Sequence, residues 1–292
     1  SGLVAIDGRG RQDVWVLASD RRLWHWDGTG WTARTVPSNR IAHDASLVVT
    51  PSGVVWVATT EPRVVPGAGP ADDPVYGWAA VILRLAHGQW RQWTLHTRPD
   101  GWLELHLWEV HPDGPLVATA AGDSLTAHTF TGDAWQALDW PLAAVLAHDG
   151  PVLVGRQRQP PVRDNVYQIQ DDLSLQVRCE GTSADMICRS RTLVLGNRSA
   201  LFGLTDCQRF RVRDGFRDDL RALTVPELSG PAGPVLLAAG DAGQLLRCEW
   251  GDGWSLTVTE LIPGPRTRVT SWATDGHTLL IASGGRVLRR GE

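Results

Sequence analysis

The stretch Asp13-Val-Trp-Val-Leu-Ala18 recurs along the chain as a short apolar strand that ends in a small residue. The other copies read Val54-Val-Trp-Val-Ala-Thr59, Pro115-Leu-Val-Ala-Thr119, Val152-Leu-Val-Gly155, Leu193-Val-Leu-Gly196, Val235-Leu-Leu-Ala238 and Leu279-Leu-Ile-Ala282. Their equivalent positions are Trp15, Trp56, Leu116, Leu153, Val194, Leu236 and Leu280, with successive spacings of 41, 60, 37, 41, 42 and 44 residues. A repeat of about 40 residues is typical of a β-propeller, and the spacing of 60 indicates an insertion.

Each copy is flanked by the signals of β-hairpins. An Asp-Gly turn precedes several of them, as at Asp113-Gly114 and Asp149-Gly150, because glycine adopts positive φ at no steric cost. A strand of alternating character follows, such as Leu23-Trp-His-Trp26, and a glycine turn then leads to a tryptophan, as in Gly28-Thr-Gly-Trp31. We therefore predict an all-β, seven-bladed β-propeller with four-stranded antiparallel blades.

We expect a single propeller domain over residues 1–292. Its blades are expected at about 3–37, 44–96, 103–140, 142–179, 183–213, 220–261 and 268–290. Only three residues follow Arg289, so the last blade either lacks an outer strand or has it outside this sequence. A free strand edge of this kind invites pairing with another chain. The tryptophans expected to wedge between blades are Trp15, Trp24, Trp56, Trp90 and Trp254.

The composition limits the classes of partner. Apolar residues make up 42% of the 292 residues and charged residues 21%, enough for a substantial core. The net charge of −4 argues against non-specific binding to nucleic acid or to an anionic membrane. All 28 basic residues are arginine, and the chain has 15 tryptophans. There is neither an apolar run of about 18 residues nor a signal-peptide pattern, so we expect a cytoplasmic protein that does not span a membrane.

The four cysteines have no C-x-x-C spacing and are too few for a disulfide scaffold. They are Cys179, Cys188, Cys207 and Cys248. Free cysteine most often behaves as a small buried hydrophobe, which is the expectation here. A bridge between Cys179 and Cys188 is the alternative.

The first repeat also carries a family resemblance. The pattern Asp13-Val-Trp-Val, Leu23-Trp-His-Trp-Asp-Gly28 and Trp31 resembles repeats of bacterial propellers of the BNR/Asp-box, tectonin and two-component-regulator types. The glycine–tryptophan turn occurs in blades 1, 2, 3 and 6 alone, and it departs from the Asp-box consensus Ser-x-Asp-x-Gly-x-Thr-Trp. The Gly-His and Trp-Asp landmarks of WD40 repeats are missing. The resemblance implies a fold and leaves the function open.

Long connections are expected on one face of the propeller. In this fold the loops between the second and third strands of a blade emerge beside the connections between blades, and the long segments here include Thr60–Ala79 and Arg156–Asp164. Binding residues concentrate on long loops of rigid frames, and Tyr, Trp and Arg are the usual hot-spot types. The candidate partner-binding residues are Arg63, Tyr76, Trp78, Arg98, Trp102, Arg158, Arg163, Phe216, Arg217 and Arg266.

No catalytic constellation is apparent. The chain has two tyrosines, Tyr76 and Tyr167, and neither is expected on an inner wall where a sialidase would need its nucleophile. It has no Gly-x-Ser-x-Gly elbow, phosphate loop or His-Glu-x-x-His motif. His96, His106 and His111 match no metal-binding spacing. We therefore expect no catalytic residues, metal or cofactor.

The sequence favours a non-catalytic protein–protein interaction module, within a bacterial signalling or defence system. A tectonin-like lectin is the alternative, because exposed aromatic rings can stack on sugars. Such a lectin should have equivalent pockets in most blades, whereas the insertions here are confined to blades 2 and 4. That asymmetry favours a single partner protein, and a propeller hydrolase ranks third.

Overall fold

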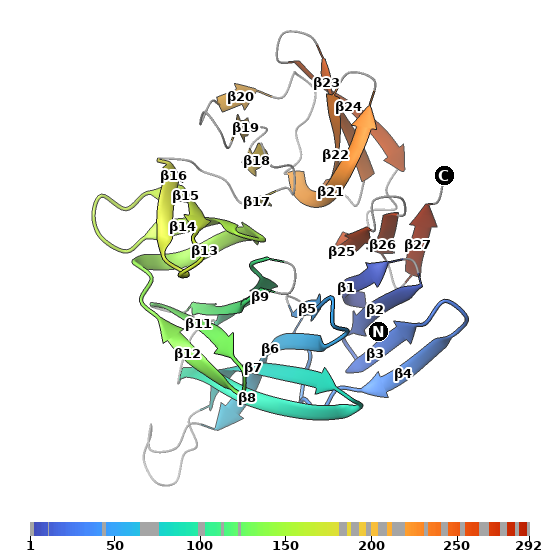
Figure 1. The fold of residues 1–292 in the computed structure, drawn as a ribbon, viewed down its shortest axis with the longest axis vertical. Coiled ribbons are helices and arrows are strands. Elements are labelled where there is room, and N and C mark those ends of the chain that lie inside the picture. Colours follow the sequence, from blue (N-terminus) through green and yellow to red (C-terminus); the bar gives the residue numbers. More distant parts are fainter. Residues whose placement is uncertain are drawn as a thin grey trace. The chain divides into compact units, whose positions relative to one another are not determined.

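The computed structural model describes residues 3–180 apart from gaps at 11, 43–44, 65–75, 99–102, 112–113 and 122–123. From 181 onward it describes only the backbone of the strands. All regular secondary structure in these described residues is β-strand, and the strands form seven sheets, six with four strands and one with three (Figure 1). None of the described residues belongs to a helix long and apolar enough to cross a membrane.

The chain divides into two compact units, Ser1–Ala144 and Val145–Glu292. The first unit holds sheet 1 (β1–β4), sheet 2 (β5–β8) and sheet 3 (β9–β12), and in each sheet the strands are ordered as in the sequence. Their bounds are β1 Leu3–Gly10, β2 Asp13–Ala18, β3 Arg22–Trp26, β4 Trp31–Thr35, β5 Ser46–Val49, β6 Val55–Val64, β7 Tyr76–Ala86, β8 Gln89–Arg98, β9 Glu104–Glu109, β10 Leu116–Ala121, β11 Leu125–Thr131 and β12 Ala134–Leu138.

Sheets 4 to 7 follow, and the first strand of sheet 4 starts just before the boundary between the units. Their strands are β13 Leu142–Asp149, β14 Val152–Gln157, β15 Asp164–Ile169, β16 Leu175–Cys179, β17 Met186–Ile187, β18 Leu193–Gly196, β19 Ala200–Gly203, β20 Arg209–Arg211, β21 Leu220–Gly230, β22 Gly233–Gly240, β23 Leu245–Gly251, β24 Ser255–Ile262, β25 Val269–Thr274, β26 Leu279–Ser283 and β27 Arg286–Arg290. Sheet 7 (β25–β27) has three strands among the described residues, in agreement with the expected missing outer strand.

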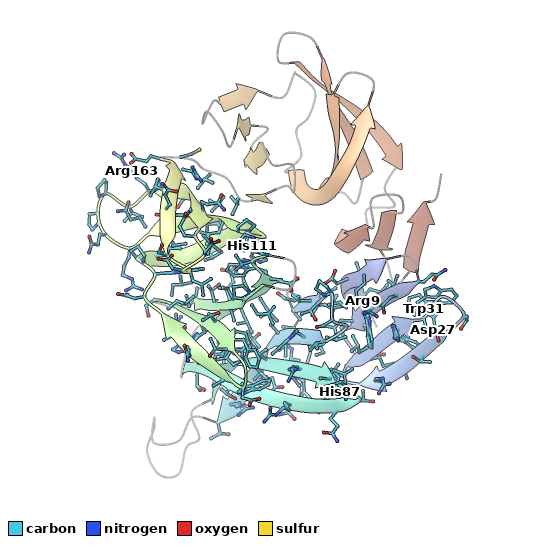
Figure 2. All side chains as sticks on the ribbon, in the orientation of Figure 1. Arg9, Asp27, Trp31, His87, His111 and Arg163 are labelled. Carbon is cyan, nitrogen blue, oxygen red and sulfur yellow. The ribbon has the colours of Figure 1, made fainter. Side chains whose placement is uncertain are left out.

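The glycine–tryptophan turn of sheet 1 is organised by an aspartate. Asp27 Oδ1 accepts hydrogen bonds from Thr29 Oγ1 at 2.7 Å, Thr29 N at 2.8 Å and Gly30 N at 2.9 Å. The Thr29 hydroxyl, followed by the two backbone N–H groups, lowers the pKa of Asp27 to about 2. Gly28 has a φ of 92°, a conformation that favours glycine. The turn delivers Trp31 to the start of β4, where it is 45% exposed (Figure 2).

Two apolar clusters join neighbouring sheets of the first unit. One lies between sheets 1 and 2 and includes Trp15, with Trp90 packed against it. The other lies between sheets 2 and 3 and includes Trp56. The packing expected of these three tryptophans is confirmed. Trp24 is half-buried, and the Cζ atom of Arg22 lies 5.9 Å from the centroid of its ring. Trp254 lies outside the described residues.

One cysteine departs from the expectation. Cys179, at the end of β16, is buried as expected, but it is disulfide-bonded. The expectation of a free thiol was therefore wrong at this position. Cys188 and Cys207 lie outside the described residues, and of Cys248 the backbone alone is described, in β23.

Candidate interaction surface

Sheet 2 contains a three-stranded ribbon that extends past the end of its first strand. β6 pairs with β7 as far as Val64↔Tyr76, and β8 follows β7 as far as Trp78↔Arg98. The first strand, β5, pairs with β6 only as far as Ala58. Among the described strands, the end of β6 therefore has a strand partner on one side alone.

This ribbon corrects the expectation of a loop over Thr60–Ala79. Strand pairing continues through Val64 and resumes at Tyr76, and the segment between them lies outside the described residues. The backbone stays extended because Thr59, Thr60 and Val64 are β-branched, a residue type that favours strands. Arg63 and Trp78 are therefore strand residues.

The connection between β4 and β5 covers the open edge of β6. Ala42 N donates to Thr59 Oγ1 at 2.9 Å. Asn39 N and Ser38 Oγ both donate to Glu61 Oε1, at 3.1 and 2.5 Å, and the Glu61 side chain is 1% exposed. Side-chain oxygens of β6 thus accept hydrogen bonds from the connection and hold it against the ribbon.

The two faces of the ribbon carry different candidate residues. Residues paired directly across a ladder point to the same face, so Trp78 and Arg98 share one face, while Arg63, paired with Gly77, lies on the other. Trp78 is half-buried and packs against the cluster between sheets 2 and 3. On the opposite face an Arg63 Nη2 lies 3.5 Å from Glu61 Oε2. The structure thus brings Trp78 and Arg98 together and separates Arg63 from them.

Positive charge gathers at this end of sheet 2. The Arg40 guanidinium, from the β4–β5 connection, lies over the Trp78 ring with Cζ 5.4 Å from the ring centroid. Val64, which follows Arg63 in β6, is 54% exposed. We name the set Arg40, Arg63, Val64, Trp78 and Arg98 the ribbon end. It combines guanidinium groups, an aromatic ring and an exposed aliphatic side chain.

Two further candidates lie in sheet 4, in the second unit. Arg158 is exposed just after β14, and Arg163 is exposed just before β15, with its Nη1 3.8 Å from Glu180 Oε2 (Figure 2). The expected loop Arg156–Asp164 is shorter than predicted, because Arg156 and Asp164 pair across the β14–β15 ladder. Their side chains also form a two-bond ion pair at 2.8 and 3.2 Å.

The remaining candidates cannot be placed by side chain. Tyr76 lies on the β7 backbone, and its side chain is outside the described set. Trp102, Phe216, Arg217 and Arg266 lie outside the described residues altogether.

The sequence reasoning missed Glu61 and Arg40. Glu61 follows an apolar run and continues its alternation, Val55, Val57, Thr59, Glu61, so a charged residue falls on the buried face of the strand. A carboxylate there needs donors from outside its own hairpin. That signal was available in the sequence, but the identity of the donors was not.

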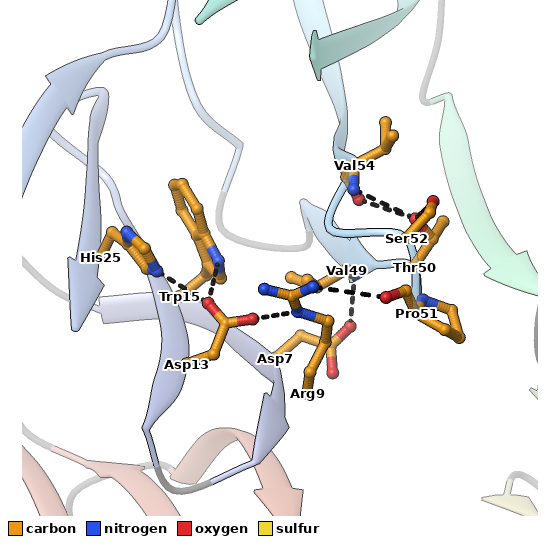
Figure 3. A network of polar contacts seen from close by, with 10 residues as sticks. All are labelled: Asp7, Arg9, Asp13, Trp15, His25, Val49, Thr50, Pro51, Ser52 and Val54. Atoms are coloured by element: carbon orange, nitrogen blue, oxygen red, sulfur yellow. Dashed lines mark hydrogen bonds and ion pairs between the residues drawn. The ribbon is translucent and has the colours of Figure 1, made fainter. Parts of the chain in front are cut away.

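Sheet 1 carries a second polar network, at its β1–β2 and β2–β3 pairings (Figure 3). Asp13 Oδ1 accepts from His25 Nε2 at 2.7 Å and from Trp15 Nε1 at 3.0 Å, and its Oδ2 accepts from Arg9 Nε. The His25 and Trp15 rings stack with centroids 3.9 Å apart. Arg9 Nη1 also donates to Pro51 O, in the turn before β6, at 3.3 Å. The network therefore ties sheet 1 to sheet 2.

Asp13 is used as an acceptor in this network. Its burial would raise the pKa, but the hydrogen bonds and charges of Arg9 and His25 outweigh burial and hold the pKa of Asp13 below its usual value. The hydrogen bonds of Asp13 join it to Arg9, Trp15 and His25, and Arg9 in turn reaches Pro51. No three His, Cys, Asp or Glu side chains in the described part of the chain gather as a metal site. Among the described residues, the network's contacts are therefore those of a structural tie.

No family model and no curated protein matches the chain. Solved structures do resemble it. The Dos1 propeller is 11% identical with a TM-score of 0.58, and the match covers 100% of this chain and 78% of that one. This likeness over the whole chain shows that our protein also has a β-propeller fold. A structure of YCF48 bound to D1 peptide is 14% identical with a TM-score of 0.56, covering 100% and 93% of the two chains. A chain in the mitotic checkpoint complex is 14% identical with a TM-score of 0.58, covering 98% and 88%.

Proposed function

We propose that this chain is a seven-bladed, non-catalytic β-propeller that binds a partner protein through the ribbon end. The observation that carries the proposal is the extension of β6, β7 and β8 past the first strand of their sheet, anchored by buried Glu61. Seven sheets and resemblances that span the length of the chain support the seven-bladed propeller.

The chemistry of the ribbon end favours a protein with acidic side chains. Guanidinium groups pair with carboxylates in a flat, two-bond geometry. Arg98 supplies one on the Trp78 face, Arg40 supplies one over the Trp78 ring, and Arg63 supplies one on the opposite face, beside Glu61. Trp78 and Val64 add apolar area. The bonds from Glu61 to Ser38 and Asn39 hold the surface in place before binding, so less ordering entropy is lost on association.

The fold resemblances add indirect support for a protein partner. One similar structure is of YCF48 bound to D1 peptide, and another is of the mitotic checkpoint complex. We propose the same class of partner for this chain. Tyr76, Trp102, Arg158, Arg163, Phe216, Arg217 and Arg266 remain candidate partner-binding residues. A bacterial signalling or defence assembly also remains a proposal.

The cytoplasmic location is likewise a proposal. The disulfide at Cys179 argues against this location, because disulfides are rare in the cytosol and persist in oxidising compartments.

The experiment compares two matched arginine pairs. Arg63→Gln with Arg98→Gln alters the ribbon end, and Arg22→Gln with Arg34→Gln alters exposed arginines of sheet 1. Each full-length variant is used to capture proteins from a lysate of the source organism, and the captured protein is then titrated by calorimetry. We expect the ribbon-end pair to weaken binding about tenfold and the sheet 1 pair to leave it unchanged.

Two outcomes would contradict the proposal. Equal binding by both variants would show that the partner binds elsewhere. If wild type captures no stoichiometric protein, the interaction-module reading is wrong. Circular dichroism melting of each variant checks that the fold is retained.

A further inference from the structure

Buried polar atoms without partners occur in sheets 2 and 3. Among the described residues, four buried side-chain polar atoms have no hydrogen-bond partner: Arg84 Nε in β7, Thr119 Oγ1 in β10, His128 Nδ1 in β11 and Trp135 Nε1 in β12. Buried donors are normally satisfied, because leaving one unpaired costs about 1–3 kcal/mol. Arg84 Nε and Trp135 Nε1 are both N–H donors, so an acceptor is missing at each.

The side chains that carry these two donors lie against the same tryptophan, Trp56. Arg84 lies with its Cζ 5.6 Å from the ring centroid of Trp56, and the Trp135 ring lies edge-on to that ring with centroids 5.9 Å apart. Arg91 pairs with Arg84 across β7 and β8, and its Nη1 is 2.9 Å from Asp133 Oδ1, two residues before Trp135. The β7–β8 end and the start of β12 thus converge from the two sheets.

Sheet 1 holds donor atoms of the same two types with an acceptor present, although its Trp15 corresponds in the repeat to Trp56 and not to Trp135. There, an arginine Nε and a tryptophan Nε1, from Arg9 and Trp15, both donate to the carboxylate of Asp13. His25 lies across the ladder from Trp15 as Arg84 lies across from Trp56. The residue two positions before Trp56, where sheet 1 has Asp13, is Val54. Sheet 2 therefore has a cation at the position of His25 and no carboxylate at the position of Asp13.

We propose that Arg84 and Trp135 form a carboxylate-binding site between sheets 2 and 3. The ligand oxygens accept from Arg84 Nε and Trp135 Nε1, as Asp13 accepts from the equivalent atom types in sheet 1. Both side chains are half-buried, so they reach the surface while their donor atoms stay shielded from solvent. Arg91 pairs with Arg84 across the ladder, but its own charge is paired with Asp133 at 2.9 Å, so Arg84 supplies the positive charge of the site. The carboxylate comes either from a free small acid or from an acidic side chain of a peptide.

The test is a titration of the full ¹⁵N-labelled chain with sodium acetate, followed by NMR of the indole and guanidinium N–H signals. Trp135→Phe and Arg84→Lys assign the two signals by their loss. We expect both signals to shift and to saturate at acetate concentrations on the order of 1–10 mM. Sodium chloride at equal ionic strength should not produce this shift. Arg34→Lys, at an exposed position of β4, should retain it.

Three results would overturn the proposal. They are a linear response without saturation, an equal response to chloride, and retained saturation in Arg84→Lys. Either of the first two means that solvent alone meets the donors. Melting curves of the variants verify the fold, and Arg84→Gln serves as a second variant if Arg84→Lys does not fold.

A second titration identifies the source of the carboxylate. A capped Gly-Glu-Gly peptide is compared with its Gly-Gln-Gly counterpart. Binding of the glutamate peptide alone assigns the site to acidic side chains, and binding of acetate alone assigns it to free small acids. If neither peptide nor acetate binds, the site does not exist. This outcome is independent of partner binding at the ribbon end.

Discussion

Sheet 1 and the contact between sheets 2 and 3 use similar residues and differ in how their donors are satisfied. In sheet 1, the Asp13 carboxylate accepts from Arg9, Trp15 and His25 (Figure 3). Between sheets 2 and 3, aromatic rings pack around Trp56, and Arg84 Nε has no acceptor among the described residues. At the repeat position where sheet 1 has the Asp13 carboxylate, sheet 2 has Val54, which offers no side-chain acceptor to Arg84.

The aromatic contact compensates for the missing ion pair by packing. Trp56 meets Trp93, Phe130 and Trp135 with ring centroids 5.8, 4.7 and 5.9 Å away. Edge-on and offset aromatic pairs each contribute about 0.5–1.5 kcal/mol beyond their buried area. Sheets 2 and 3 are therefore held by apolar contact and by the exposed Arg91–Asp133 ion pair, while sheets 1 and 2 combine an apolar cluster with the hydrogen bonds of Asp13 and Arg9.

The largest expected loss of stability comes from removing the Asp13 carboxylate. Asp13→Leu removes the acceptor of three donors and should lower the free energy of unfolding by about 2–4 kcal/mol, measured by urea denaturation. Asp133→Asn is the matched control, because its ion pair with Arg91 is 84% exposed on the aspartate side and should be worth less than about 1 kcal/mol. Equal losses from the two variants would contradict a special role for Asp13.

An intermediate effect on stability is expected from placing a carboxylate near Arg84 at position 54. Val54→Asp restores the carboxylate at the position of Asp13, and Val54→Asn supplies the same shape without charge. We expect Val54→Asp to be more stable than Val54→Asn by about 1–2 kcal/mol, because the ion pair with Arg84 is partly shielded from solvent. The same comparison in an Arg84→Gln background should remove the difference. If the difference persists there, the carboxylate does not pair with Arg84.

The Val54→Asp variant also sharpens the proposed ligand site. Its own carboxylate should compete with acetate for Arg84, so the NMR titration should lose saturation in Val54→Asp and keep it in Val54→Asn. Unchanged acetate binding in Val54→Asp would mean that the sheet 1 arrangement is not transferable.

The smallest expected effect is a dependence of stability on pH. Burial, followed by the charge of His96, lowers the pKa of His128 below its usual 6.5. The unfolded chain therefore takes up a proton at His128 before the folded chain does, so stability should decline as pH falls below about 6.5. Asp13, whose folded pKa is below 3.8, should add a further loss as pH falls below about 3.8.

Urea denaturation at pH values from 8 to 5 measures the histidine effect. His128→Leu should flatten the decline below pH 6.5, whereas His111→Asn, at an exposed position, should leave it intact. An unchanged slope in His128→Leu would assign the decline to other groups.

The repeat alone was sufficient to predict the all-β fold. The apolar segments at Trp15, Trp56 and Leu116 all became the second strands of their sheets, since alternation and turn residues act within a single hairpin. The ribbon of sheet 2 is harder to predict from the sequence, because Thr60–Ala79 has prolines and glycines at its centre and therefore resembles a loop. Only the pairing of β6 with β7 reveals that both ends of that segment are strand.

The candidate site likewise has features that the sequence predicts and features that only the strand pairing reveals. Trp78 and Arg63 could be selected by residue type, but their opposite faces follow from the register of the ladder. Glu61 gained its role from Ser38 and Asn39, more than 20 residues earlier in the chain. A pattern read within one strand does not contain that contact.

The sequence by itself determined the repeat, the hairpins and the positions of the tryptophans, because these depend on interactions between residues close in the chain. The tertiary structure decided which polar atoms are satisfied. Arg9 reaches Pro51 and Asp13, and Arg84 and Trp135 approach Trp56 from different sheets. Hydrogen bonds are short and directional, so a difference of a few ångströms in the packing of two sheets separates a paired donor from an unpaired one.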